Sequence, residues 1–146
     1  MSEMAEFRFD AARNGVYKAP QVLEALRLAA VSEAVAWCDL DLAGVGAKKA
    51  FLERCAGALK FPDGFGNNWD ALADCLEDLS WQPPAGIIVH WHGGSDFARH
   101  ARDDFFTAIE IFTAACSFWS QRSRIMLVAL DRTSCGNGAL PVLPPQ

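Results

Sequence analysis

The sequence predicts an α/β fold in which a small three-stranded parallel sheet is packed with about four to five helices. Three short runs have the composition of strands, and amphipathic segments with helical spacing separate them. Two of these runs are apolar almost throughout, as is typical of strands that are covered on both faces. Strands that alternate with helices in this way favour a parallel sheet with right-handed helical crossovers.

Turn residues bound the three predicted strands. VAWCDLDL (35–42) is rich in strand-forming residues and precedes a Gly-Val-Gly turn. GIIVHW (86–91) follows Pro83 and Pro84, which end any helix before it. RIMLVAL (124–130) is the third run and, like the second, is apolar enough for a buried strand.

Four helices are predicted around these strands. Residues 20–31 and 47–60 each place apolar side chains along one stripe. A helix from Asp103 or Asp104 through Trp119 repeats large apolar residues every three or four positions. The fourth helix begins near Trp69 and lies in the most acidic part of the chain.

The chain is expected to form a single domain over residues 1–146. Its core spans 35–130, between an N-terminal extension with one helix (1–34) and an irregular tail (131–146). No apolar run approaches the roughly 20 residues needed to cross a bilayer. The N-terminus MSEMAEFRFD also lacks the basic start and apolar run of a signal peptide. We therefore expect a cytoplasmic protein that does not associate with membranes.

The sequence offers little support for catalysis. Its five cysteines are scattered and form no CxxC pair, which favours reduced thiols. His90 and His92 point to the same side of a strand, but no third ligand has convincing spacing, so neither a metal nor another cofactor is expected. A hydrolase built on the carboxylate pair Asp70 and Asp74 lacks any sign of a cleft. The sequence therefore predicts a protein that is not an enzyme.

The negative charge of the chain is concentrated in one segment. The formal net charge is −5, from 18 acidic and 13 basic residues. Between Phe61 and Ala98 there are six acids and no lysine or arginine, which leaves 12 acids and 13 bases elsewhere. Such a segment argues against direct binding of nucleic acid, because a phosphate backbone needs cationic partners. It favours a basic protein as the partner.

FPDGFGNNWDALADCLEDL (61–79) contains five of these acids. Gly64 and Gly66 predict a bent loop with positive-φ conformations, and Asn67 or Asn68 can cap the helix that follows. At about 100° per residue, four acids fall within about one quadrant of the helical wheel: Asp70, Asp74, Glu77 and Asp78. The opposite stripe consists of Trp69, Leu72, Leu76 and Leu79. One side of the helix is therefore expected to be buried while the acidic side faces solvent.

The acidic side lacks the interleaved lysines that a surface optimised for solubility normally carries. Glu77 and Asp78 lie towards the negative end of the helix dipole, and Asp74 and Asp78 have the repulsive spacing of like charges at i and i+4. Two interpretations follow from the electrostatics alone. The face either binds a cationic partner or is an ordinary solvated face, since uncompensated acidic helices also occur without a partner.

FPDGFGNNWDALADCL (61–76) resembles the signature of the barstar family, the intracellular inhibitors of guanyl-specific ribonucleases. The shared pattern is a proline, an acidic residue, aromatic-Gly-x-Asn, and then hydrophobic-Asp-Ala-Leu-x-Asp-x-Leu. More loosely, the resemblance covers residues 35–130, with strands and helices in the expected order. It implies a small three-stranded parallel sheet packed with helices, and inhibition of a nuclease by plugging its active site.

The resemblance also implies roles for individual residues. Asp74 would take the place of an RNA phosphate among the basic side chains of the nuclease, and Asp70 would pair with a neighbouring cation. The loop would lie against the nuclease, while Asn68 would chiefly hold the turn into the helix. The partner-binding residues expected on this basis are Asp74, Asp70, Gly64, Phe65, Gly66, Asn68, Glu77 and Asp78.

Three positions depart from the best-known member of the family. That protein has aromatic residues where this chain has Gly64 and Ala73, and an acid on its last helix near Ala114. These departures predict a different cognate partner, which would be a ribonuclease or a ribonuclease-type toxin. The alternative is a barstar-like binding module whose basic partner is not a ribonuclease.

Overall fold

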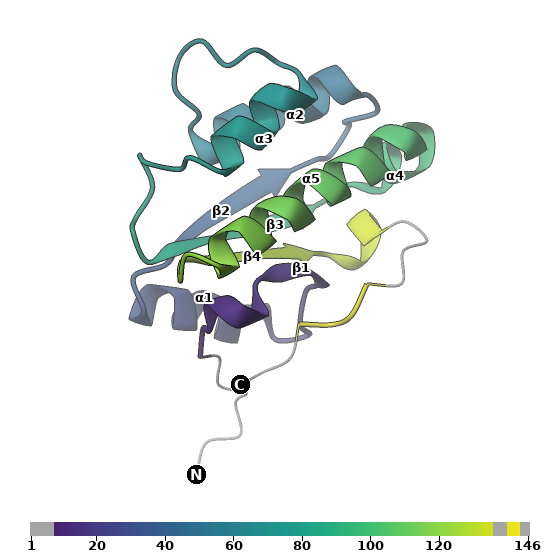
Figure 1. Cartoon of the computed structure of the whole chain (residues 1–146). Coiled ribbons are helices and arrows are strands. Elements are labelled where there is room, and N and C mark those ends of the chain that lie inside the picture. Colours follow the sequence, from purple (N-terminus) through teal and green to yellow (C-terminus); the bar gives the residue numbers. More distant parts are fainter. Residues whose placement is uncertain (1–7, 136–139, 144–146) are drawn as a thin grey trace.

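A computed structural model describes residues 8–135 and 140–143 of the chain. Within these residues, four parallel strands form one sheet in the order β1-β4-β3-β2 (Figure 1). The strands are β1 (Gly15–Lys18), β2 (Ala36–Asp41), β3 (Gly86–His92) and β4 (Ile125–Leu130). The predicted α/β class and parallel sheet are therefore confirmed, but the predicted number of three strands is wrong.

The additional strand, β1, lies in the N-terminal extension, for which the sequence predicts only a helix. It pairs in parallel with β4, so that Gly15 lies beside Leu127. Asn14 secures its start, because its side-chain oxygen accepts a hydrogen bond from the backbone N–H of Met126 at 2.9 Å. Four residues of mixed polarity are too few to show the alternation that marks a strand. The strand becomes evident only beside its distant partner.

Five α-helices occur in the described residues: α1 (Leu23–Ser32), α2 (Lys48–Leu59), α3 (Trp69–Leu76), α4 (Ser95–His100) and α5 (Arg102–Ser120). Four correspond to the predicted helices, and α4 is an addition whose six residues are too few to show a helical period. The tail is less irregular than expected. It begins with a 3₁₀ helix at Arg132–Cys135, and Val142 forms a bridge to Lys18.

Helices cover both faces of the sheet (Figure 1). On one face, a large core lies beneath α2, α3 and α5 and includes Leu40, Phe51, Leu72, Trp91, Phe112 and Val128. On the other face, α1 packs over a smaller cluster that includes Leu26, Ala30, Ile88, Leu127 and Ala129. Alternate side chains of β3 and β4 thus enter different cores, which explains why these strands are apolar on both sides. No helix in the described part of the chain has the length and hydrophobicity to span a bilayer.

Candidate functional site

The acidic segment folds as a loop over residues 61–68 that leads into α3. Asn68 is the N-cap, with an extended backbone (φ −139°, ψ 170°), and its side-chain oxygen accepts a hydrogen bond from the backbone N–H of Ala71 at 2.7 Å. Its amide nitrogen donates to the carbonyl of Gly66 at 3.3 Å. Asn67 instead adopts a left-handed conformation with φ of 51°. Of the two candidate caps in the sequence, Asn68 therefore fills the role.

The two glycines of the loop serve different purposes. Gly64 has a φ of 92°, and a Cβ there would meet open space, so the glycine is needed for its conformation alone. The expected positive φ is wrong for Gly66. A Cβ at that position would lie 3.2 Å from the side-chain nitrogen of Asn68 and 3.5 Å from the Cβ of Ala71. Gly66 therefore leaves room for the capping side chain.

Aromatic contacts anchor the loop to the body of the protein. The rings of Phe65 and Phe61 lie 4.9 Å apart, and Phe61 contacts the ring of Trp81 edge-on at 6.0 Å. The indole N–H of Trp81 donates to the carbonyl of Leu59, at the end of α2, at 2.8 Å. Phe61 and Phe65 are half-buried against the main core. The loop is thus held by packing as well as by the cap, and part of Phe65 stays accessible.

One side of α3 is buried and the other faces solvent, as the helical wheel predicts. Leu72 and Leu76 are fully buried, whereas Asp70 and Asp74 are exposed. Burying a leucine side chain contributes about 1.5–3 kcal/mol. Two such anchors fix the rotation of a helix of only eight residues. The direction in which the carboxylates point is therefore set by the core beneath them.

The carboxylates of the loop and of the first turns of α3 have no cationic partner among the described residues of the protein. In residues 8–135 and 140–143, neither Asp63, Asp70 nor Asp74 forms an ion pair or accepts a hydrogen bond. The ammonium of Lys48 lies over the ring of Trp69, 5.2 Å from its centre. These three exposed carboxylates thus present their charge to solvent, which is the arrangement required of a surface that binds a cationic partner.

The acidic helix ends earlier than the helical wheel assumes. Glu77 is the C-cap (φ −98°, ψ 7°) and is only half exposed. Asp78 lies beyond the helix and Leu79 turns the chain with a φ of 49°. The expected continuation of the acidic stripe as far as Asp78 is therefore wrong. Asp78 instead lies near Arg124. Burial lowers the pKa of the Arg124 guanidinium, and the negative charge of Asp78 opposes this shift.

Trp119 on α5 and Arg124, the residue before β4, donate to carbonyl groups at the end of α3 and in the segment that follows it. The indole N–H of Trp119 donates to the carbonyl of Leu76 at 2.7 Å. The Nη2 of Arg124 donates to the carbonyls of Leu79, Gln82 and Pro83 at 2.8, 3.1 and 2.9 Å. The guanidinium also lies 4.7 Å from the centre of the Trp119 ring. Trp119 therefore stabilises the C-terminal end of α3, where the acids oppose the helix dipole, and Arg124 holds the segment that follows the helix.

An open hollow of about 190 Å³ separates the loop from α3. Its lining consists of Pro62, Asp63, Gly64, Phe65, Gly66, Ala71, Asp74 and Cys75. Burial and the negative charges of Asp78 and Asp74 raise the pKa of the Cys75 thiol. Five of the eight residues that the sequence predicts for the site line this hollow or cap its helix: Asp74, Gly64, Phe65, Gly66 and Asn68. Asp70 lies one turn before Asp74 on the exposed side, and Glu77 and Asp78 lie at the far end.

A second cluster of polar side chains contains His90 and His92, which the sequence analysis considered as metal ligands, and Asp39, which it did not identify. Asp39, on β2, lies close to His90 and His92, on β3, and their possible ligand atoms are all within 4.8 Å of one another. The sequence shows no third ligand for the two histidines because the register between β2 and β3 is not readable from spacing. This cluster lies on the sheet face opposite α3, so it is separate from the acidic surface.

Comparison with known protein families gives one match. Residues 35–131 match the model of the family described as barstar (barnase inhibitor). The match covers more than half of the chain, includes the acidic loop and α3, and begins after α1. A search among curated proteins found no significant match. The family is one of inhibitors, and the chain belongs to the barstar family.

Proposed function

We propose that this protein inhibits a ribonuclease by inserting the loop 61–68 and the first turns of α3 into its active site. Asp74 takes the place of an RNA phosphate, and Asp70 pairs with a neighbouring cation of the nuclease. The observation that carries this proposal is the pair of exposed carboxylates on a helix whose opposite side is fully buried. Membership of a family of ribonuclease inhibitors supports it.

The chemistry of a ribonuclease active site suits this arrangement. A site that holds a phosphodiester directs several cationic donors towards one anion, and charge-assisted hydrogen bonds from such donors are the strong ones. A carboxylate held in place by the core loses little conformational freedom when it binds. Opposite charges on the two proteins also accelerate association, most strongly at low salt. Asp74 therefore contributes to affinity, and the whole acidic surface contributes to the association rate.

The remaining predicted site residues support or extend this contact. Gly64, Phe65 and Gly66 shape the rim of the hollow beside Asp74. Asn68 stabilises the start of α3 as its N-cap. Glu77 and Asp78 extend the negative field at the far end of α3. The absence of large side chains at Gly64 and Ala73, and of an acid at the exposed Ala114, favours a nuclease whose rim differs from the best-known family partner.

The proposal is tested by measuring the inhibition constant for a guanyl-specific ribonuclease encoded or secreted by the same source. Asp74→Asn removes the charge and keeps the shape. Loss of a buried charged contact costs about 2 kcal/mol or more, so inhibition should weaken by about 30-fold or more. Glu24→Gln is the matched control, because Glu24 is exposed on α1, across the sheet from α3, and should leave inhibition unchanged.

Two outcomes separate the proposal from its alternative. If Asp74→Asn and Glu24→Gln inhibit equally well, Asp74 does not occupy the phosphate position. If the protein inhibits no ribonuclease yet retains a basic protein in a pull-down, and Asp74→Asn abolishes that retention, the acidic surface serves a partner of another class. Identification of the retained protein by mass spectrometry then decides between the two functions.

A further inference from the structure

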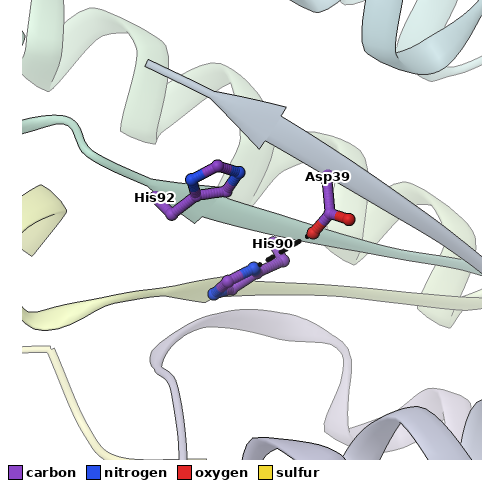
Figure 2. A group of neighbouring side chains, drawn as sticks. All are labelled: Asp39, His90 and His92. Carbon is purple, nitrogen blue, oxygen red and sulfur yellow. Dashed lines mark hydrogen bonds and ion pairs between the residues drawn. The ribbon is translucent and has the colours of Figure 1, made fainter. Parts of the chain in front are cut away.

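The cluster of Asp39, His90 and His92 lies where β2 and β3 run side by side. The parallel register places Asp39 beside His90 and Asp41 beside His92. Leu40 and Trp91, between these residues, point into the main core on the opposite face. All three side chains of the cluster therefore project from the same face of the sheet, towards its carboxyl edge (Figure 2).

The distances suit a metal ion with small adjustments. The Nδ1 of His90 lies 3.2 Å from the Oδ1 of Asp39. Ligand atoms in a tetrahedral zinc site lie about 3.3–3.6 Å apart, because the bonds to the metal are about 2.0–2.2 Å long. The possible ligand atoms of all three residues lie within 4.8 Å of one another, so His92 must approach by about 1–1.5 Å to reach that spacing. It is the last residue of β3, and its side chain is 35% exposed, which leaves it room to move.

Neighbouring groups hold these side chains in the orientation that a metal site needs. The indole N–H of Trp37 donates to the Oδ1 of Asp39 at 3.0 Å, and the Trp37 ring packs against the buried His90 ring at 5.7 Å. The Nδ1 of His92 lies 3.8 Å from a carboxylate oxygen of Asp41. A carboxylate behind a histidine is the usual partner that orients a metal-binding imidazole.

The surrounding charges do not block a cation. Arg27 lies 3.8 Å from the Oδ2 of Asp39, but both side chains are about half exposed, so this ion pair contributes little. Asp39 and Asp41 give the cluster two carboxylates. A hydrogen bond between Asp39 and His90 explains how a buried histidine is satisfied, but it leaves the stacking of His92 on His90 at 5.3 Å without a role.

We propose that Asp39, His90 and His92 bind one divalent transition metal ion of the zinc class, with solvent completing its coordination. Imidazole nitrogens combined with one carboxylate suit zinc and exclude magnesium and calcium, which prefer oxygen ligands. The exposed sides of Asp39 and His92 leave a position open to water. This site lies across the sheet from α3 and does not depend on the proposed inhibition of a ribonuclease.

The test is a calorimetric titration of Zn²⁺ into the full chain, prepared without a histidine tag, stripped of metal and kept reduced. The expected result is saturable binding of one Zn²⁺ per chain. Loss of even an outer partner of a metal ligand lowers affinity by 10–100-fold, so His92→Ala and Asp39→Asn should each weaken binding by at least about tenfold. Both residues are partly exposed, and circular dichroism shows whether the variants remain folded.

Two matched controls exclude other ligands. His100 is the only other histidine in the sequence. It lies 62% exposed on α4, beside Asp96, so His100→Ala should bind Zn²⁺ as the wild type does. Cys75 is the half-exposed thiol among the described residues, and Cys75→Ser should also leave binding unchanged.

The proposal is overturned if the wild type takes up no stoichiometric Zn²⁺, or if His92→Ala and Asp39→Asn bind it as tightly as the wild type. Loss of binding in His100→Ala or Cys75→Ser would overturn it too, because the ion would then lie elsewhere. The Zn²⁺ titrations involve no nuclease. A negative Zn²⁺ result therefore does not count against the proposed inhibition of a ribonuclease. A negative inhibition result likewise does not count against the metal site.

Discussion

Arg124, the residue before β4, donates hydrogen bonds to the segment that follows α3, and its removal should destabilise the protein strongly. The substitution Arg124→Met keeps an unbranched, flexible side chain but removes the guanidinium, including its contact with the Trp119 ring. Three carbonyls, those of Leu79, Gln82 and Pro83, then lose their hydrogen bond from Arg124. All three belong to the segment that leads from α3 into β3. The change tests whether this segment depends on one cation.

The magnitude follows from the hydrogen bonds. Nη2 carries two protons for three carbonyls, so one proton is shared and two bonds are counted. A hydrogen bond to a charged group contributes about 1.5–3 kcal/mol, and the lower value applies because the side chain of Arg124 is only half buried. Two such bonds give about 3 kcal/mol. The cation–π contact with Trp119 adds about 0.5–1 kcal/mol, part of which the Met sulfur replaces.

Urea unfolding followed by tryptophan fluorescence measures this loss. With a slope of about 2 kcal/mol per molar urea, a loss of about 3 kcal/mol lowers the midpoint by about 1.5 M. Arg122→Met is the matched control, since the exposed Arg122, just after α5, donates to the carbonyl of Phe118 at 2.8 Å and lies 3.6 Å from the centre of the Phe118 ring. It should cost less than about 1 kcal/mol. Equal losses in the two variants would refute the assignment of Arg124 as the residue that holds this segment.

Three further predictions concern the site and its surroundings. Asn68→Ala removes the cap and should cost about 1 kcal/mol in urea unfolding, whereas Asn67→Gly, at a φ of 51°, should cost almost nothing. Among the described cysteines Cys75 should be alkylated first, as judged by peptide mapping; Asp74→Asn should accelerate the reaction by lowering its pKa, and bound partner should slow it. Burial opposes ionisation of Asp131, but hydrogen bonds from Ser134, Thr133 and Gly93 outweigh it and lower its pKa. The resulting stability is present above about pH 4, the pKa of the unfolded chain, and is lost as the pH falls through the folded pKa. Asp131→Asn should therefore reduce the difference in urea midpoint between pH 7 and pH 3, and an unchanged difference would count against the role of Asp131.

The sequence predicts the longer elements of this fold and misses the shortest ones, β1 and α4. β3 and β4 are readable because each is apolar almost throughout, and α2 and α5 are readable because their stripes are long. β1 has four residues, and its parallel pairing with β4 depends on residues more than 100 positions away, such as Leu127 beside Gly15. α4 has six residues and lacks a period. Short elements are stabilised by neighbours that the local sequence does not reveal.

The candidate functional site could also be predicted only in part from the sequence. The orientation of Asp70 and Asp74 could be predicted because Leu72 and Leu76 fix the helix from below. The position of Asp78 could not, since the helix stops where Leu79 turns the chain with a φ of 49°. That turn is held by Arg124, which lies 45 positions further along the chain from Leu79. The proximity of Asp39 to His90 was hidden for a related reason, because it depends on the register of two strands separated by two helices.

The way in which α3 is held explains how an acidic surface can be both rigid and uncompensated. Its N-terminal end is capped by the amide of Asn68, and its last carbonyl receives the indole N–H of Trp119. Both groups are neutral, so they satisfy the backbone without cancelling the charge of Asp70 or Asp74. The cation that is used, Arg124, acts beyond the end of the helix, next to Asp78. A lysine or arginine one turn from Asp74 would stabilise the free protein by a few tenths of a kcal/mol. It would also compete with the cations of any partner, and the neutral donors avoid that competition.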